Sequence, residues 1–229
     1  MAVKKLIVSI TGRKKKDWLD KLKEIDRYKI KEVALFMQLF PPSQKKGLLK
    51  ALKNSSIKKI PLVHIREDTT KKEIDFLTKH FSSRYFTIHE YLFNRLTNWR
   101  GDYQKLYLEM STDDRVAPYV QVEKIGGFCI DLAHYKKQAV WQTKDYVYIV
   151  EHLQNIDCSC NHLSGYSYKT NLDLHTVTSV RDFDYIYQLP HNLFGKVIAL
   201  EIFNPIREQI KYQKLLKKSI KKKLGFTII

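Results

Sequence analysis

Histidine, aspartate and glutamate residues stand at the ends of six short apolar runs that follow one another along the chain. They are His64, His89, Glu109, Asp131, His162 and Glu201. These residues are nearly all the strongly polar side chains in those runs, and burying them without partners would be costly. A mixture of imidazole and carboxylate suits zinc, manganese or iron, whereas an all-oxygen set suits magnesium or calcium. The pattern therefore predicts a metal site, provided that the six runs converge.

Two local motifs add further ligand-type side chains to this set. Asp131-Leu132-Ala133-His134 follows one of the apolar runs directly, and Asp173-Leu174-His175 lies beyond the run that ends at His162. The nine candidate ligands exceed the needs of one ion, because zinc typically takes about four. We therefore expect two or three divalent ions, with zinc as the best fit and manganese or iron as alternatives.

Eight apolar runs rich in β-branched and aromatic residues alternate with longer amphipathic stretches. The runs cover residues 5–10, 33–40, 60–65, 85–89, 106–110, 128–131, 156–162 and 197–202. Helical periodicity marks residues 17–25, 45–52 and 70–80 between them, and more weakly 146–153 and 182–189, of which 185–189 could instead be a strand. This alternation predicts an α/β fold with a parallel eight-stranded sheet, a (β/α)8 TIM barrel, as a single domain over residues 1–229. The chain is small for this fold, so we expect short loops and helices.

A barrel explains why ligands from distant parts of the chain would meet. The carboxyl ends of its parallel strands lie on one face, and the active sites of these enzymes are built there. Six ligand-type side chains from six consecutive strands would then point into a single bowl.

The composition indicates the kind of partner and compartment. Lys plus Arg number 41 against 24 Asp plus Glu, a formal net charge of +17, which favours DNA or another phosphate-bearing substrate. The lysines are nevertheless spread over many amphipathic segments, as on an ordinary solvated surface. No apolar run is long enough for a membrane span, and three cysteines show no disulfide pattern, so we expect a cytoplasmic protein. Cys158 and Cys160 should share one face of a strand as small core residues. The oligomeric state stays open.

The motifs resemble the xylose isomerase-like barrel superfamily, and most closely its endonuclease IV branch, the family 2 abasic-site endonucleases. The family has Asp-Thr-x-His after strand six, where this chain has Asp131-Leu132-Ala133-His134, and Asp-Arg-His where this chain has Asp173-Leu174-His175. Asn161-His162-Leu163-Ser164, Leu108-Glu109 and Leu200-Glu201 also fit, and His64 and His89 stand where the family places histidines. The similarity spans roughly residues 5 to 205.

This resemblance implies a trinuclear site and a metal-dependent phosphodiester hydrolase acting at abasic DNA. One ion would be held by His64, His89 and Glu109. Glu109 would bridge to a second ion, which Asp131, His162 and Glu201 also bind. His134, Asp173 and His175 would hold the third. Glu109 and Glu201 are the expected catalytic residues.

Two other functions are compatible with the same residues. Sugar isomerases and epimerases of the superfamily use the strand-five Glu, strand-six Asp, strand-seven His and strand-eight Glu with one metal, and Glu109 and Glu201 would then move a proton next to a carbonyl. A metal-oxidative or non-catalytic relative is the third alternative, because the fold alone does not choose the chemistry. The chain is also shorter than typical endonuclease IV members, which leaves less loop to grip a duplex.

Overall fold

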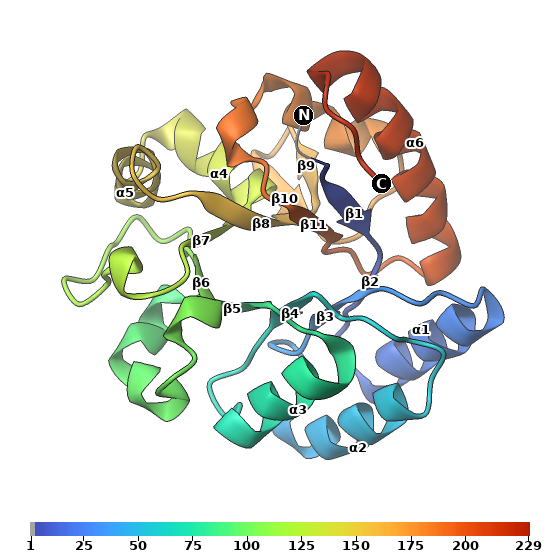
Figure 1. The fold of residues 1–229 in the computed structure, drawn as a ribbon. Helices are drawn as coiled ribbons and strands as arrows, with labels where there is room; N and C mark the ends of the chain where they lie inside the picture. The colour runs from blue at the N-terminus through green and yellow to red at the C-terminus, as the bar shows by residue number, and fades with distance from the viewer. Residues whose placement is uncertain (1–2) are drawn as a thin grey trace.

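The strands of this protein form a closed parallel barrel. A computed structural model describes residues 3–229, and its main sheet runs in the order β1-β11-β8-β7-β6-β5-β4-β3-β2 (Figure 1). β1 (Lys5–Ile7) and β2 (Ser9–Ile10) are two parts of one N-terminal segment: β1 pairs with β11 (Val197–Leu200), and β2 pairs with β3 (Ala34–Phe36). The other strands are β4 (Leu62–His64), β5 (Tyr85–His89), β6 (Leu106–Glu109), β7 (Phe128–Asp131) and β8 (Cys158–Leu163). Each expected apolar run supplies one strand position, so the α/β barrel is confirmed.

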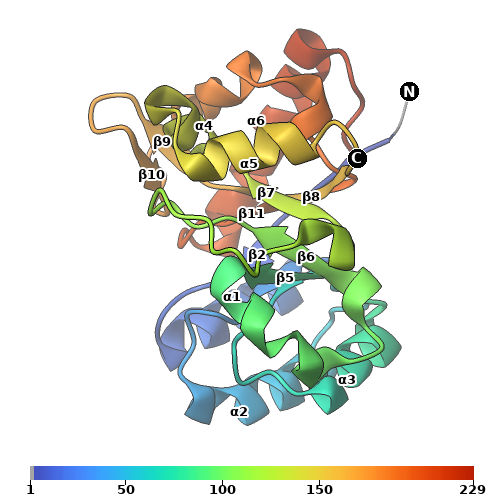
Figure 2. The ribbon, with the colours of Figure 1, turned by 90° about the vertical axis from the view of Figure 1, so that its left-hand side faces the viewer.

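Helices surround the sheet on its outer side, as Figures 1 and 2 show. They are α1 (Lys15–Arg27), α2 (Pro42–Lys53), α3 (Lys71–Phe81), α4 (Leu132–Trp141), α5 (Lys144–His152) and α6 (Ile206–Leu224). The amphipathic stretches at 17–25, 45–52, 70–80 and 146–153 are therefore helical. α3 begins at the expected Thr70, whose side chain accepts from the Glu73 amide while Glu73 accepts from the Thr70 amide at 2.7 Å.

Three connections depart from a regular strand-helix repeat with short loops. β5 and β6 are joined by the 3₁₀ segments Glu90–Trp99 and Tyr103–Lys105, and the β6–β7 connection contains only the 3₁₀ turn Val122–Lys124. Between β8 and β11 lies the hairpin of β9 (Gly165–Ser167) and β10 (Leu172–Leu174), followed by the 3₁₀ segments Val180–Gln188 and His191–Leu193. Residues 185–189 are therefore not a strand. Turn-forming residues such as Asp114, at φ 59°, interrupt helical periodicity after β6.

The core has two layers, one inside the barrel and one between the sheet and the helices. Phe36, Leu62 and Tyr107 belong to the inner cluster. Cys160 lies there too, but Cys158 packs in the outer cluster, so the expectation that both cysteines share a face is wrong. The pairing of β7 with β8 shifts register between Phe128 and Cys129, and this irregularity breaks the alternation of side chains in β8.

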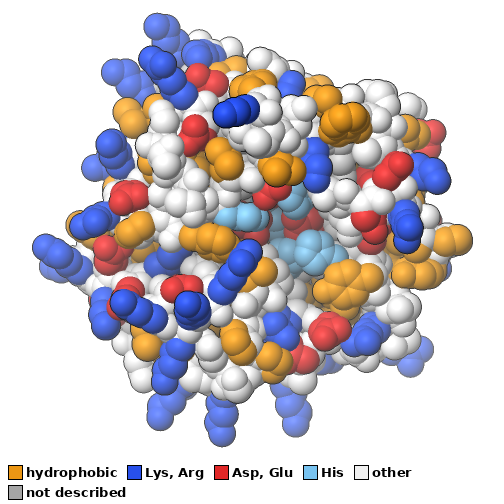
Figure 3. All heavy atoms as spheres, turned by 180° about the vertical axis from the view of Figure 1, so that it is seen from behind, with side chains coloured by type: hydrophobic (Ala, Val, Ile, Leu, Met, Phe, Trp, Pro, Cys, Tyr) orange, Lys and Arg blue, Asp and Glu red, His pale blue; other side chains and the backbone are white. Residues whose placement is uncertain are grey.

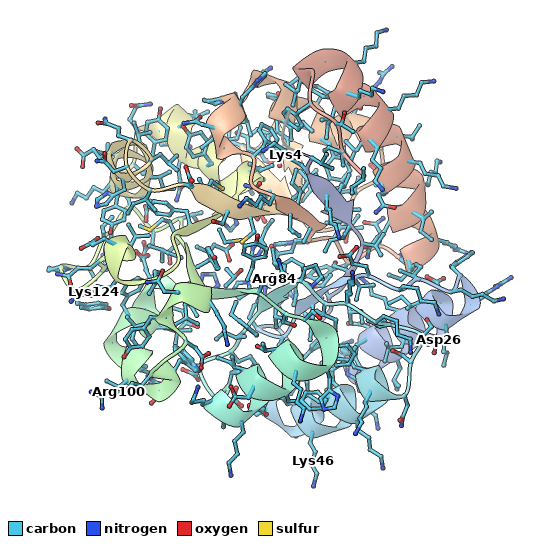
Figure 4. All side chains as sticks on the ribbon, in the orientation of Figure 1. Lys4, Asp26, Lys46, Arg84, Arg100 and Lys124 are labelled. Atoms are coloured by element: carbon cyan, nitrogen blue, oxygen red, sulfur yellow. The ribbon has the colours of Figure 1, made fainter. Side chains whose placement is uncertain are left out.

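The positive charge is spread over the outer surface. Lys46, Arg100 and Lys124, from three different connections, are exposed and lie at the periphery of the ribbon in Figure 4. This distribution resembles a solvated surface more than one concentrated basic patch. Among the described residues, no helix is both long and apolar enough to cross a membrane.

Candidate metal centre

The alternation of side chains along each strand turns the six strand-end ligands inward. In five of the strands the residue two positions earlier belongs to the inner cluster; these residues are Leu62, Tyr107, Cys129, Cys160 and Ala199. With a period of two, His64, Glu109, Asp131, His162 and Glu201 point to the same side of the sheet. His89 follows Thr87, which contacts His162, at the end of β5. Ionisable side chains thus form a layer above the apolar barrel floor.

Glu109 lies at the centre of this layer. Its Oε2 is 3.3 Å from His64 Nδ1 and 3.2 Å from His162 Nδ1, and its Oε1 is 3.7 Å from His134 Nδ1. His162 Nδ1 is also 3.3 Å from Glu201 Oε2. The His64 ring lies 4.7 Å from the His89 ring and 5.1 Å from the His162 ring, centroid to centroid.

Several of these atoms are buried but have no hydrogen-bond partner within residues 3–229. They are both ring nitrogens of His64, Nδ1 of His89, His134 and His162, Oε2 of Glu109 and Oδ2 of Asp131. Four of the seven lie within 4 Å of a carboxylate oxygen or an imidazole nitrogen yet lack hydrogen-bonding geometry. Leaving such groups unsatisfied is costly, so atoms aimed at a shared point fit a cation better than they fit one another. The donor set of imidazole and carboxylate suits zinc, manganese or iron.

Two groups of side chains could hold a metal ion here. His64, Glu109 and His162 offer ligand atoms that lie within 4.8 Å of one another, and so do Glu109, Asp131, His162 and Glu201. Both groups are buried and share Glu109 and His162. The resemblance assigned His89 rather than His162 to the ion near His64; in the structure His89 packs against His64 but is not in that group.

Burial and neighbouring charges shift the pKa values of the cluster in both directions, and the nearby carboxylates raise the pKa of His162 and of His134. Burial lowers the pKa of His64 and of His89, which keeps both imidazoles neutral, the form that binds metal. Burial alone would raise the pKa of Glu109, but His162 and His64 hold it well below its usual range. Burial, with Glu109 nearby, raises the pKa of Glu201 to about 7. The pKa values of the two central carboxylates therefore shift in opposite directions, because the neighbouring imidazoles outweigh burial at Glu109 but not at Glu201.

The remaining three candidates lie at the edge of the cluster on other elements. His134 is in the first turn of α4, whereas Asp173 and His175 belong to β10 and the residue after it. His175 Nε2 is 3.1 Å from Asp173 Oδ2, and His134 Nε2 is 4.0 Å from Asp173 Oδ1. The hydrogen bond from His175 lowers the pKa of Asp173 to about 2. These three residues lie together, with Asp173 and His175 as an ion pair and His134 beside them.

The structure adds contacts that sequence patterns did not single out. Gln38, two residues beyond the inward-facing Phe36, donates from Nε2 to Glu201 Oε1 at 3.0 Å. The Phe36 ring meets the His162 ring edge-on at 4.8 Å. The same two-residue rule that selects the ligands would have selected Gln38, but its amide side chain is not a usual metal ligand.

Figure 3 looks onto the face where these residues lie. Histidine and acidic side chains gather in a central hollow, and most lysine and arginine side chains stand around the edge of the molecule. The candidate set is therefore partly open on this face: His134, Asp173 and His175 are half-buried, whereas His64, Glu109 and His162 are buried.

Comparison with known proteins adds little to this picture. No family model matches the chain, and no curated protein sequence matches it. Among solved structures, the chain is similar to a phospho-2-dehydro-3-deoxyheptonate aldolase (DAHP synthase) from Thermotoga maritima, at 10% identity and a TM-score of 0.42, over 100% of this chain and 71% of that one. The resemblance to endonuclease IV accordingly remains a prediction from motifs.

Proposed function

We propose that this protein is a divalent-metal-dependent phosphodiester hydrolase of the endonuclease IV type. The observation that carries the proposal is the inward-facing layer of imidazole and carboxylate groups whose buried polar atoms have no other partner in the described chain. A barrel with such a layer at its strand ends is the usual setting for metal-assisted chemistry.

The ligands would be shared among two or three ions. His64, His89 and Glu109 would hold one ion, and Asp131, His162 and Glu201 a second, with Glu109 between them. His134, Asp173 and His175 would hold a third. When bound, such ions supply Lewis acidity and lower the pKa of a water molecule. Zinc suits the mixed donor set best, and manganese or iron would also fit.

Positively charged side chains near the cluster can meet the phosphates of DNA or of a smaller ester. Arg13 lies over the Phe203 ring at 5.5 Å, and that ring stacks on His175 at 5.2 Å. On another element, Lys136 lies 6.0 Å from the Tyr168 ring. Arginine binds phosphate with two parallel hydrogen bonds, so Arg13 is the better candidate for orienting a phosphodiester.

A sugar or sugar-phosphate isomerase is the second candidate, because one observation favours it. Glu109, Asp131, His162 and Glu201 converge within 4.8 Å, and these four are the ligands that the single-metal branch of the superfamily would use. In that enzyme Glu109 and Glu201 would move a proton at the carbon next to a carbonyl, and their opposite pKa shifts suit the roles of base and acid.

Metal content and cleavage together test the first proposal. Elemental analysis of protein loaded with zinc or manganese should find two or three ions per chain; a single ion would contradict the multinuclear hydrolase and favour the isomerase. The loaded protein should cleave a duplex with one abasic site, and Glu109→Gln should lower the rate by a factor of about 100 or more. Lys46→Gln, on the far outer surface, serves as the control and should cleave normally. Absence of cleavage in loaded wild-type protein would overturn the abasic-DNA version.

A further inference from the structure

A second group of carboxylates lies outside the histidine-containing cluster. Glu90 begins the segment after β5, Asp113 is in the loop after β6, and Asp145 is in the first turn of α5. Each offers an oxygen within 4.8 Å of the other two. Figure 2 faces this side of the molecule, where the loop after β6 passes between the segment after β5 and α5. Three separate elements thus bring three acids together.

Two of these acids are buried and carry carboxylate oxygens that have no hydrogen-bond partner in the described chain. Asp145 is 0% exposed, and neither of its carboxylate oxygens has a hydrogen-bond partner in residues 3–229. Glu90 is 6% exposed, and its Oε2 has no partner either. In the described chain no Lys, Arg or His lies within ion-pair distance of these two or of Asp113; the ion pairs all involve other residues.

This arrangement is costly without a cation. Buried carboxylates repel one another, and an unpaired buried charge is expensive. Burial raises the pKa of Asp145 to about 6, which reports the same cost. A cation bound among the three oxygens would remove the repulsion and supply the missing partners.

The space beside the acids suits a hydrated ion. A cavity of about 430 Å³ adjoins two of the acids, Glu90 and Asp113, and Asp145 is not in its lining. Its lining includes Glu90, Tyr91, Ser111, Asp113, Arg115 and Tyr119. Asp113 is exposed and stands where an ion would enter, and water in the cavity can complete the coordination. Arg115 lines the same cavity without pairing with any of the three acids.

The geometry points to a site for a hard divalent cation, calcium or magnesium, formed by Glu90, Asp113 and Asp145. These ions prefer oxygen ligands, and calcium accepts irregular sets of six to eight. The absence of imidazole distinguishes this site from the central cluster. The ion would join the loop after β6 to α5 and to the segment after β5.

Terbium, which replaces calcium at oxygen sites and emits when tyrosine transfers energy to it, gives a direct test. Tyr91 and Tyr119 line the cavity, so excitation of tyrosine in metal-free protein should give saturable terbium emission that excess calcium abolishes. Asp113→Asn, at an exposed position, and Asp145→Asn should each weaken terbium binding about tenfold or more, because fewer charged ligands remain. Glu109→Gln should leave it unchanged, which separates this site from the proposed hydrolase centre.

Three results would overturn the proposal. The first is the absence of saturable emission in wild-type protein, as expected if Arg115 neutralises the acids in solution. The second is undiminished binding in Asp113→Asn, a variant whose folding is not at risk. The third is terbium emission that survives in a Tyr91→Phe/Tyr119→Phe double variant, which would put the lanthanide elsewhere. Calcium and magnesium titrations by calorimetry then decide which ion binds more tightly.

Discussion

Gln38 is the residue that most clearly extends the candidate centre beyond its ligands. It donates to Oε1 of Glu201 and so orients the other oxygen, Oε2, toward His162. Its backbone carbonyl accepts from Arg66 Nη1 at 3.0 Å, which ties this position to the loop after β4. A group that holds a ligand in place contributes to metal affinity without touching the metal.

We expect Gln38→Ala to lower zinc affinity by about 10- to 100-fold, because Glu201 loses the contact that orients it. Competition with a chelator of known affinity measures the change. Gln44 provides a matched control, since its side chain also makes one hydrogen bond, from Trp18 Nε1, but on α2 away from the centre. Equal losses of zinc affinity in Gln38→Ala and Gln44→Ala would show that the loss does not come from the contact between Gln38 and Glu201.

The buried Lys21 should make folding stability depend on pH, independently of the metal centre. It is buried in α1, donates to the Ile202 carbonyl at 3.0 Å, and burial lowers its pKa to about 7. In the unfolded chain the amine stays charged up to about pH 10.5. Between these values the unfolded state binds more protons, so folding stability should rise with pH, by up to about 1.4 kcal/mol per unit.

Lys21→Met should remove this rise, since methionine fills similar space and Gln209 still donates to the Ile202 carbonyl, at 3.4 Å. Urea unfolding at pH 7, 8.5 and 10 measures the free energy of unfolding. The variant should be more stable than wild type by the largest amount at pH 7, and this difference should shrink toward pH 10. Lys23→Met changes a side chain that is 76% exposed, so its unfolding free energy should depend on pH as that of wild type does. If the unfolding free energy of Lys21→Met rose with pH as much as that of wild type, burial of the Lys21 amine would not be the cause of the rise.

At the scale of elements, the junction of β7 and α4 combines stability with ligation. Asp131 ends the strand and caps the helix: its Oδ1 accepts from the amides of Ala133 at 2.8 Å and His134 at 2.9 Å. Its Oδ2 remains unpartnered and belongs to the candidate ligand group. One carboxylate therefore starts the helix that carries His134 and also faces the centre.

The two roles of Asp131 can be separated by substitution. Asp131→Asn keeps a capping oxygen but loses the charge, so metal affinity should fall while the stability of metal-free protein changes little. Asp131→Ala loses both and should cost about 1 kcal/mol more in unfolding free energy. Denaturant unfolding in chelator and metal calorimetry measure the two effects. If both variants were equally destabilised, the helix cap formed by Oδ1 would not account for the contribution of Asp131 to stability.

At the scale of the whole molecule, the centre joins strands that are far apart in the sequence. Its ligands come from β4, β5, β6, β7, β8 and the end of β11, so a bound ion would link most of the barrel. In its absence, buried groups of like charge face one another, and any ion that binds only the folded state stabilises it by mass action.

Removal of metal should therefore lower the melting temperature. Zinc added to metal-free protein at about 100 times its dissociation constant should restore about 2.7 kcal/mol. Differential scanning calorimetry with and without chelator measures this, and Glu109→Gln should lose most of the zinc response. A wild-type melting temperature that does not respond to zinc would contradict metal binding at the centre.

The sequence by itself determined the barrel and placed the candidate ligands at its strand ends. Apolar runs at strand spacing, with helical periodicity between them, are local signals, and a period of two then decides which side chains face inward. Residues such as His64, Glu109 and His162 could be chosen on that basis alone.

Only the tertiary structure decided the features that depend on register and on the path of loops. The contact of Gln38 with Glu201 joins the loop after β3 to the end of β11, and the separation of Cys158 from Cys160 follows from an irregular strand pairing. Three connections pack together and bring Glu90, Asp113 and Asp145 close to one another, although no motif in the sequence links these residues. Such juxtapositions are set by long-range packing, which local patterns do not encode.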